Sequence, residues 1–344
     1  MSASVQLTRR SFAALTIAGA LGGFRVPAFA AAPPMARVIL DNDFSGDPDG
    51  LFQLAQHLLS PSVDIPLIVG SHLPDSSGFP NSGHTASEAA AKVHELLDVM
   101  GRSDSVPVLA GSNRGIVTRG NHDPSPATAA IVALAMRENA AGPLVYAAGA
   151  GLTELALAWI AEPRIGPRLK LIWIGGQEHP GLAYPPPGAD AMEFNQSIDP
   201  LAAQIIFNQS DIDIWQVPRN AYRQMLFSNA ELRELEQSGP LGRYLVGEIT
   251  ALAGMIERIM PDYPFPRSET YILGDSPLVT LTALQSFFQP DPSSSLYALR
   301  PTPRINAAGA YEENPAGRPM RIYTQIDTRL TFADMMAKFR EAGA

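Results

Sequence analysis

The chain has 344 residues, enough for one large α/β domain or two smaller ones, and 46% of them are hydrophobic, which provides for a sizeable core. A formal net charge of −9 argues against a nucleic-acid partner. The absence of cysteine excludes disulfides, thiolate metal sites and a cysteine nucleophile, and no apolar run of membrane-spanning length follows the first thirty residues.

The start of the chain has the pattern of an export signal. Arg9-Arg10 lies in a twin-arginine pattern, T-R-R-S-F, which leads into an apolar stretch and then an A-x-A cleavage site at 28–30. We therefore expect residues 1–30 to be a twin-arginine signal peptide and residues 31–344 to form the mature protein. The expected location is the periplasm, with no membrane attachment after cleavage.

Residues 37–217 alternate between short apolar runs and longer segments with a helical pattern. Continuous apolar runs are typical of parallel strands that helices cover on both faces. The order therefore predicts the α/β class, with an open, mainly parallel sheet flanked by helices. The expected strands are 37–40, 65–69, 106–110, 144–148, 169–175 and 212–217, and the expected helices are 51–59, 85–100, 127–139, 152–161 and 200–208.

After Pro218 the pattern becomes mainly helical. No segment is long enough to be a linker between domains, so a single domain is expected. Two loops rich in proline and glycine, 74–83 and 176–189, are of a length that often forms functional lids. The expected late elements are helices at 230–237, 241–260, 278–288 and 331–342, and a strand at 321–326.

Four aspartates crowd into the run D-N-D-F-S-G-D-P-D-G, residues 41–50, directly after the first predicted strand. Carboxylates this close repel one another unless a cation lies among them, and a hard divalent ion with oxygen ligands is the natural partner. In open α/β sheets, such strand ends are where sites are built. The run is therefore a candidate metal and catalytic site.

The aspartate run alone allows more than one chemistry. An EF-hand loop is excluded, because Phe52 stands where its last ligand should be glutamate and a strand precedes the loop. A phosphatase of the haloacid dehalogenase type would use Asp41 as nucleophile and Asp43 as acid and base. The late acidic pair of that class is incomplete here, because Asp275 has no second acid four residues on. A metal-dependent phosphatase stays an alternative.

Several segments together resemble the nucleoside hydrolase family. They occur in the order of that family and span about residues 36–340. The run 41–50 is similar to the family's D-T-D-I-G-N-D-V-D-D, and A-G-A-G-L-T-E-L-A at 148–156 is similar to its G-P-L-T-N-L-A turn. Three more similarities are I-G-G at 174–176 with M-G-G, E-F-N at 193–195 with A-E-F-N, and D-S-P-L at 275–278 with H-D-P-L-A.

This resemblance implies a fold, a reaction and a cofactor. The family has an open, mostly parallel α/β sheet, holds Ca²⁺ at the carboxyl ends of the strands, and hydrolyses the N-glycosidic bond of ribonucleosides. In that reaction the metal holds a water and the ribose hydroxyls, and the sugar passes through an oxocarbenium-like state. The implied partner is a small nucleoside or related N-riboside, and family members commonly form homo-oligomers.

The resemblance also assigns the Ca²⁺ ligands. Asp43 matches the family's general base and metal ligand, Asp275 matches the distant aspartate that closes the site, and the carbonyl of Gly149 matches a backbone ligand. The second aspartate of the family's terminal pair is a further ligand, but Gly50 stands in its place. Asp47 is expected to stand in for it, because Ca²⁺ tolerates irregular geometry.

The sugar contacts of the family match better than its contacts to the base. Asp49 matches the residue that holds a ribose hydroxyl, and Glu193 and Asn195 match the residues that grip the 5′ and 3′ side of the sugar. At the base end, the histidine that acts as leaving-group acid in some members is replaced by Gly274.

The departing base needs either a proton or a ring that can carry the charge. The candidate donors are His72, near the end of the second predicted strand, and His179 and Tyr184, in the loop 176–189. Because Gly50, Pro187 and Gly274 replace polar residues of the family pattern, a third interpretation is a binding protein that keeps the ribose pocket without catalysis.

Overall fold

The computed structural model describes residues 33–74, 77–80, 82–118, 124–138, 140–262, 268–286, 288 and 290–343. The expected signal peptide, residues 1–30, lies outside the described residues. From Pro34 to Ala344 the chain forms one compact unit.

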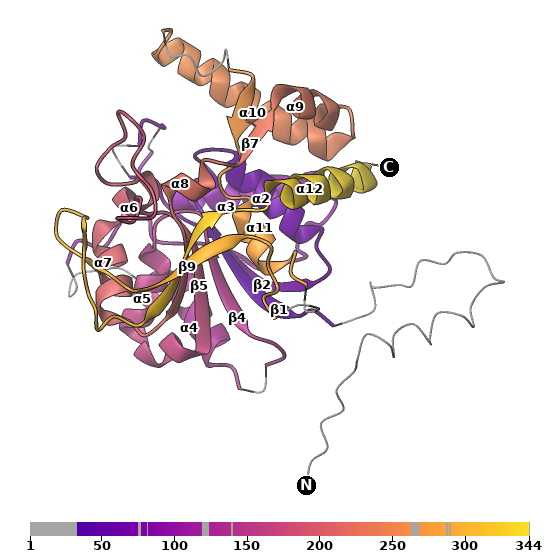
Figure 1. Ribbon diagram of the computed structural model, residues 1–344. Coiled ribbons are helices and arrows are strands. Elements are labelled where there is room, and N and C mark those ends of the chain that lie inside the picture. Colours follow the sequence, from indigo (N-terminus) through magenta and orange to yellow (C-terminus); the bar gives the residue numbers. More distant parts are fainter. Residues whose placement is uncertain are drawn as a thin grey trace, which may run out of the picture. The chain divides into compact units, whose positions relative to one another are not determined.

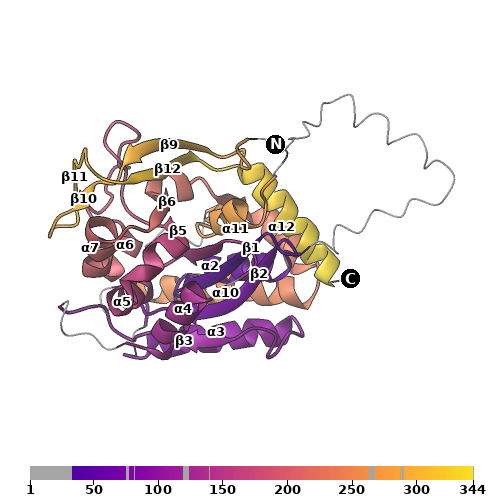
Figure 2. The same ribbon diagram turned by 90° about the horizontal axis from the view of Figure 1, so that it is seen from below.

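The centre of this unit is an eight-stranded sheet in the order β3-β2-β1-β4-β5-β6-β12-β9 (Figure 1). All neighbouring strands are parallel except β9 and β12, which pair antiparallel at one edge. Figure 2 shows these two strands at one side of the sheet and β3 at the other. The strands are β1 (Ala36–Asn42), β2 (Val63–Gly70), β3 (Val108–Ala110), β4 (Leu144–Ala148), β5 (Leu169–Ile174), β6 (Asp213–Val217), β9 (Leu296–Pro301) and β12 (Pro319–Gln325).

Helices cover both faces of the sheet, so the inner strands are apolar on each side. In β1, Val38 and Leu40 point into one hydrophobic cluster and Ile39 points into the other. The first cluster lies under α2 (Asp49–Leu58), α3 (Thr85–Val99), α11 (Pro277–Thr282) and α12 (Thr328–Gly343). The second lies under α4 (Pro126–Met136), α5 (Thr153–Ala161) and α7 (Pro200–Gln209).

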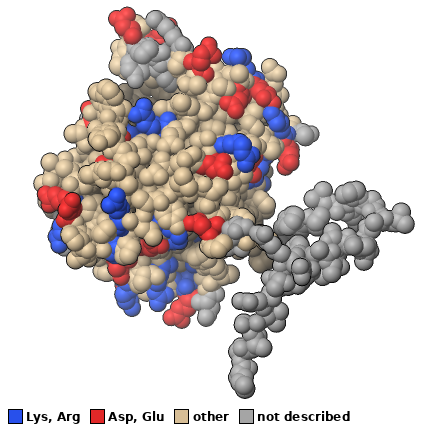
Figure 3. All heavy atoms as spheres, in the orientation of Figure 1, with Lys and Arg blue, Asp and Glu red and all other residues tan. Residues whose placement is uncertain are grey.

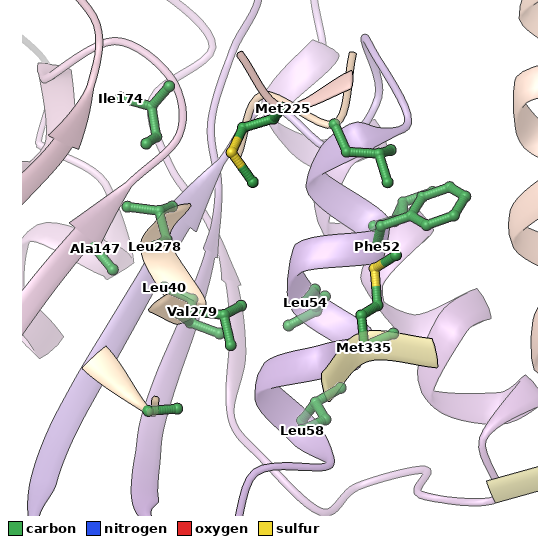
Figure 4. Packing of buried hydrophobic residues seen from close by; sticks show 14 of the residues in the cluster. Leu40, Phe52, Leu54, Leu58, Ala147, Ile174, Met225, Leu278, Val279 and Met335 are labelled. Carbon is green, nitrogen blue, oxygen red and sulfur yellow. The ribbon is translucent and has the colours of Figure 1, made fainter. Parts of the chain in front are cut away.

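The first cluster fixes the helix that follows the aspartate run. Figure 4 shows Leu278 and Val279 of α11 pointing toward Leu40 and Ala147 of the sheet. In the same view, Met335 of α12 lies against α2. The start of α2 and the start of α11 are therefore held beside the carboxyl ends of β1 and β4, and each of these helix starts carries an aspartate at or before its first turn.

The remaining elements extend this framework. The helices α9 (Asn229–Glu236) and α10 (Pro240–Ile259) project beyond the first layer above the short pair β7 (Leu226–Ser228) and β8 (Thr270–Ile272), as Figure 1 shows. The others are η2 (Pro163–Arg168), α6 (Phe194–Ile198), α8 (Arg219–Tyr222), β10 (Arg304–Ile305) and β11 (Tyr311–Glu312).

The predicted parallel sheet and its flanking helices are confirmed, with corrections after Pro218, where the short strands β7, β8, β10 and β11 had no predicted counterpart. The helix expected at 278–288 ends at Thr282, and the chain then turns back on itself, with the Ser286 amide donating to the Pro292 carbonyl at 2.9 Å. β9 had no predicted counterpart, because an edge strand that is mostly exposed lacks the continuous apolar run of the inner strands.

The surface carries charges of both signs. Figure 3 shows lysine and arginine intermixed with aspartate and glutamate on the face that it presents. Among the described residues, no helix has both the length and the apolar composition needed to cross a membrane.

Candidate functional site

A pocket of about 280 Å³ lies where β1, β4 and β5 end. It collects residues from strand ends, from helix starts and from two loops that are distant in the sequence. The residues that line it are Asp43, Asp47, Asp49, Phe79, Gly149, Ile174, Glu193, Phe194, Asn195, Tyr222, Ile272, Gly274 and Asp275. The pocket thus brings together all the predicted metal ligands and all three predicted sugar contacts.

Asn42, the last residue of β1, organises the acidic side of the pocket. Its Oδ1 accepts from the backbone N–H of Asp43 at 2.9 Å, and its Nδ2 donates to Oδ2 of Asp275 at 2.7 Å. One buried amide therefore links the aspartate run to an aspartate more than 200 residues away in the sequence. The sequence pattern gave no reason to single out Asn42.

Two glycines leave the space that the Asn42 amide fills. A Cβ on Gly149 would lie 2.4 Å from Asn42 Nδ2, and a Cβ on Gly50 would lie 2.6 Å from it. A side chain at either position would therefore displace Asn42. Gly50 is the position where the resemblance predicts a second aspartate, and with the Asn42 amide in this place a side chain at residue 50 has no room.

The other aspartates are joined through their backbone. The N–H of Asp275 donates to Oδ2 of Asp49 at 3.2 Å, and the N–H of Asp49 donates to Oδ1 of Asp47 at 3.2 Å. Tyr271 also donates its hydroxyl to Asp47 Oδ1. Asp47 therefore reaches the pocket, as the sequence predicted, with one of its carboxylate oxygens already engaged.

These carboxyls resist ionisation. Burial raises the pKa of Asp43 and Asp49 well above the usual range, and the charges of Asp275 and Asp47 raise both further. Burial likewise raises the pKa of Asp275 to about 7. No lysine, arginine or histidine is among the described residues that line the pocket, and Arg219, whose charge acts on Glu193, is already paired with Glu178 at 2.7 Å.

This donor chemistry fits a hard divalent cation. The donors are anionic oxygens in a buried setting, which is what Ca²⁺ and Mg²⁺ select. Among the described residues, no three acidic or imidazole side chains already surround one point, so the carboxylates line the pocket wall and are not gathered on a single centre. The structure therefore supports a cation by its chemistry and does not identify the metal.

The opposite wall is built from E-F-N at the start of α6. Glu193 caps that helix, and its Oε2 accepts from the N–H of Gly176 at 2.7 Å and of Gln196 at 3.1 Å. Its Oε1 accepts from the hydroxyl of Tyr222 at 2.9 Å. Glu193 is thus fixed in one orientation by three donors. Tyr222, on α8, was not among the predicted site residues.

Asn195 fastens two strand ends to each other. Its Nδ2 donates to the carbonyl of Gly149 at 2.9 Å and to the carbonyl of Ile174 at 2.8 Å. These carbonyls follow β4 and end β5, so the amide holds the pocket floor at a fixed width. We call the polar floor the set Asp43, Asp47, Asp49, Gly149, Glu193, Asn195 and Asp275.

A further aspartate supports the floor from beneath. Asp41 is buried in β1 and accepts hydrogen bonds from the hydroxyls of Ser71 and Tyr146. Burial raises its pKa to about 7. Asp41 does not line the pocket, and its contacts fit a role in holding β1, β2 and β4 together at their ends.

The mouth of the pocket is apolar. Phe194 is 40% exposed and Ile272 is 41% exposed, which is unusual for large apolar side chains. Phe79, from the loop before α3, joins them. We call Phe79, Phe194 and Ile272 the apolar rim. None of the three was a predicted site residue, because a single apolar side chain carries no signal of a site, although Phe194 lies within the E-F-N segment.

The two predicted histidine donors lie elsewhere. His179 is buried against Tyr311, with ring centroids 4.5 Å apart, and its Nε2 pairs with Gln216 Oε1 at 2.8 Å. Burial lowers its pKa to about 4. His72 is also buried and is not among the residues that line the pocket. The structure therefore brings neither histidine to the floor or the rim.

Known proteins resemble this chain in sequence and in fold. Over 61 residues it is 48% identical to an inosine-uridine preferring nucleoside hydrolase of Leishmania major, a match that spans 17% of this chain and 18% of that relative. Its fold is similar to that of a plant nucleoside hydrolase, with a TM-score of 0.66 at 18% identity, covering 89% of this chain and 99% of the other.

A purine-preferring ribonucleoside hydrolase from Gardnerella vaginalis is similar to the same degree, with a TM-score of 0.65, 18% identity and coverage of 89% and 99%. Residues 38–337 match the family model described as inosine-uridine preferring nucleoside hydrolase. This match runs from β1 to α12 and includes every residue of the polar floor. The chain therefore belongs to the inosine-uridine preferring nucleoside hydrolase family.

Proposed function

We propose that this protein hydrolyses the N-glycosidic bond of ribonucleosides or related N-ribosides. The observation that carries the proposal is the single pocket in which a polar floor of carboxylates, an amide and a carbonyl meets an apolar rim. A sugar has hydroxyls for such a floor, and a flat aglycone has apolar surface for such a rim.

Asp43 is the base in this proposal. Its carboxyl is buried and its backbone is held by Asn42, so its position is fixed. A carboxyl whose pKa is raised accepts a proton more readily than an ordinary aspartate, which suits removal of a proton from the attacking water.

The other carboxylates stabilise the charge that develops on the sugar. As the bond to the aglycone lengthens, the ring becomes positively charged and oxocarbenium-like. Glu193 and Asp49 line the pocket as preoriented negative groups, and Glu193 needs no rearrangement because three donors already hold it.

We propose Ca²⁺ as the cofactor, with Asp43, Asp47, Asp275 and the carbonyl of Gly149 as the residues that would hold it. When bound, such an ion supplies Lewis-acid polarisation and a fixed positive charge. The chain's own contribution is to hold these oxygens in place, through Asn42 at Asp275 and through Asn195 at the Gly149 carbonyl.

A reducing-sugar assay on purified protein with Ca²⁺ tests the proposal. The substrates are inosine, uridine, guanosine and the activated p-nitrophenyl β-D-ribofuranoside, and release of ribose from any of them is the expected result. The Asp43→Asn variant should be inactive, and Asp64→Asn, an exposed carboxylate at the far end of β2, serves as the matched control. No ribose from any substrate would contradict the proposal.

The same preparation separates the two alternatives. Release of phosphate from p-nitrophenyl phosphate, with no release of ribose, would favour a metal-dependent phosphatase. A raised melting temperature with ribose or inosine, with no hydrolysis, would favour a binding protein.

We propose further that the protein is exported to the periplasm by the twin-arginine route, from the sequence of residues 1–30. The test is to replace Arg9 and Arg10 by lysine and to follow the protein by cell fractionation. We expect the unchanged chain in the periplasm and the variant in the cytoplasm; the same distribution for both would contradict export by this route.

A further inference from the structure

The loop 176–189, which the sequence marked as a candidate lid, is tied down at both ends by one arginine. Near the start of the loop, Oε1 and Oε2 of Glu178 accept from Nε and Nη2 of Arg219 at 3.0 and 2.7 Å. Just beyond the end of the loop, the carbonyl of Asp190 accepts from Nη1 of the same arginine at 2.9 Å. The two ends of the loop are therefore held to each other and to α8.

The pair of Arg219 and Glu178 is shielded from water. The two side chains are only 13% and 3% exposed. A planar guanidinium that donates to both oxygens of a carboxylate fixes the direction as well as the distance of the contact. Lysine at this position would keep the charge, but its single nitrogen cannot reproduce the fork and reach the carbonyl of Asp190 as well.

These contacts determine where α8 lies. Arg219 is the first residue of this four-residue helix and Tyr222 is the last. A single helical turn is not stable by itself, so its place depends on such contacts. Residues three apart lie on the same side of a helix. Tyr222 uses this side to donate its hydroxyl to Oε1 of Glu193 at 2.9 Å, inside the pocket.

Gly176 provides a second connection from α8 to Glu193. The backbone N–H of Arg219 donates to the carbonyl of Gly176 at 3.0 Å, and the N–H of Gly176 donates to Oε2 of Glu193 at 2.7 Å. Gly176 has a φ of +82°, and a Cβ there would lie 2.2 Å from Nε2 of Gln216, so a larger residue does not fit. Each oxygen of Glu193 is therefore held by a group that Arg219 helps to place.

We propose that Arg219 is a positioning residue for the sugar side of the pocket. It does not line the pocket, and it acts on Glu193 through Tyr222 and Gly176. The proposal rests on the proposed N-riboside hydrolysis and adds to it a residue outside the pocket. A carboxylate stabilises a developing charge best when its oxygens are already in place. Loosening Glu193 should therefore lower kcat more than it raises KM.

Steady-state kinetics of Arg219→Lys on p-nitrophenyl β-D-ribofuranoside test the proposal. We expect kcat to fall by about tenfold and KM to change by less than about threefold. The double variant Arg219→Gln with Glu178→Gln removes both charges, so it leaves no unpaired charge buried, and it should show a similar loss of kcat. An unchanged kcat in both variants would overturn the proposal.

Arg318→Lys separates positioning from a contribution to stability alone. Arg318 donates to the carbonyls of Ile206, Phe207 and Ile212 at 3.0, 3.1 and 2.6 Å, and it does not line the pocket. Its replacement should lower the melting temperature, as Arg219→Lys does, but should leave kcat within about twofold. An equal loss of kcat in the two lysine variants would show that Arg219 supports only the stability of the fold.

The Glu193→Gln variant tests the route of the effect. It keeps the shape of the side chain, so cleavage of the activated substrate should stay measurable. Because both connections end at Glu193, Arg219→Lys should change kcat by less than about twofold in this background. A further tenfold loss there would show that Arg219 acts elsewhere, and would overturn the proposal.

The unchanged protein separates this proposal from the proposed function. If it cleaves the p-nitrophenyl riboside while Arg219→Lys keeps its full kcat, the positioning role is overturned and riboside hydrolysis stands. If the unchanged protein cleaves no riboside, the proposed hydrolysis is contradicted and the positioning role falls with it.

Discussion

The polar floor and the apolar rim of the pocket are built in different ways. The floor consists of side chains and a carbonyl at strand ends and helix starts, and its groups are tied to one another by hydrogen bonds. The rim consists of partly exposed apolar side chains from three places: Phe79 in the loop before α3, Phe194 at the start of α6 and Ile272 at the end of β8. The polar groups of the floor are preorganised by hydrogen bonds, whereas the rim side chains contribute apolar surface.

This difference indicates which part sets the reaction and which part sets the substrate. Groups fixed by the sheet can position the sugar and the general base as accurately as catalysis needs. Partly exposed side chains outside the core can change without disturbing it, which makes them suited to distinguish one aglycone from another. Substitutions in the floor should therefore affect all ribosides alike, and substitutions in the rim should not.

The largest expected effect is that of Asp43→Asn. The amide keeps the shape of the carboxyl but cannot accept the proton of water, so kcat/KM should fall by about 1,000-fold or more for every riboside. Steady-state assays check this, with Asp64→Asn as the control. A variant within tenfold of the unchanged protein would show that Asp43 is not the base.

A smaller loss is expected for Asn195→Ala in the same floor. The variant removes the amide that holds the carbonyls of Gly149 and Ile174, so both strand ends lose a donor. We expect kcat/KM to fall by about 100-fold, by a similar factor for inosine, uridine and p-nitrophenyl riboside. Unequal factors for these substrates would place Asn195 at the aglycone and would contradict its assignment to the floor.

The rim variant Phe194→Leu should behave in the opposite way. Leucine keeps an apolar side chain but removes the aromatic face, so the loss should be about tenfold or less and should depend on the aglycone. The ratio of kcat/KM between inosine and p-nitrophenyl riboside measures this. Phe288→Leu, at an exposed phenylalanine that does not line the pocket, is the matched control. An unchanged ratio in Phe194→Leu would contradict selection by the rim.

The sequence predicted the floor because strand-end polar residues leave a recognisable pattern. Aspartates after an apolar run and E-F-N before a proline-started helix are unusual enough to be aligned with a family. Folding then brought Asp43, Glu193 and Asp275 into one pocket, as expected from parallel strands whose carboxyl ends meet at one edge.

The sequence did not predict the partners of those residues. Asn42 and Tyr222 act through hydrogen bonds to Asp275 and Glu193, and such pairs are visible only when distant segments are placed side by side. His179 is the opposite case, a residue that the sequence predicted for the site and that lies outside the pocket. A histidine in a long loop is a plausible donor in the sequence, but packing against Tyr311 buried it away from the pocket.

A weaker effect within the floor concerns Asp47. This carboxylate already accepts from the N–H of Asp49, so it offers only part of its oxygen lone pairs to a cation. We expect Asp47→Asn to weaken Ca²⁺ affinity by about tenfold, within the range for an altered metal environment. Isothermal titration of metal-free protein checks this, with Phe194→Leu as the control that should not change. Unchanged affinity would show that Asp47 does not replace the acid lost at Gly50.

The smallest expected effect is on stability, and it also belongs to the floor. Burial raises the pKa of Asp41 and of Asp275 to about 7 from an ordinary value of 3.8. The folded state therefore binds more protons than the unfolded chain between these values, and stability must fall as pH rises through this window. We expect the melting temperature of metal-free protein to drop by roughly 5–10 °C between pH 5 and pH 8. Differential scanning calorimetry measures this drop in melting temperature.

Saturating Ca²⁺ should reduce the drop, because a cation favours the ionised carboxylates, whereas Phe194→Leu in the rim should leave the drop unchanged. A melting temperature that rises with pH in the metal-free protein would show that these carboxyls are ionised in the fold, and the contrast between floor and rim would lose its electrostatic basis.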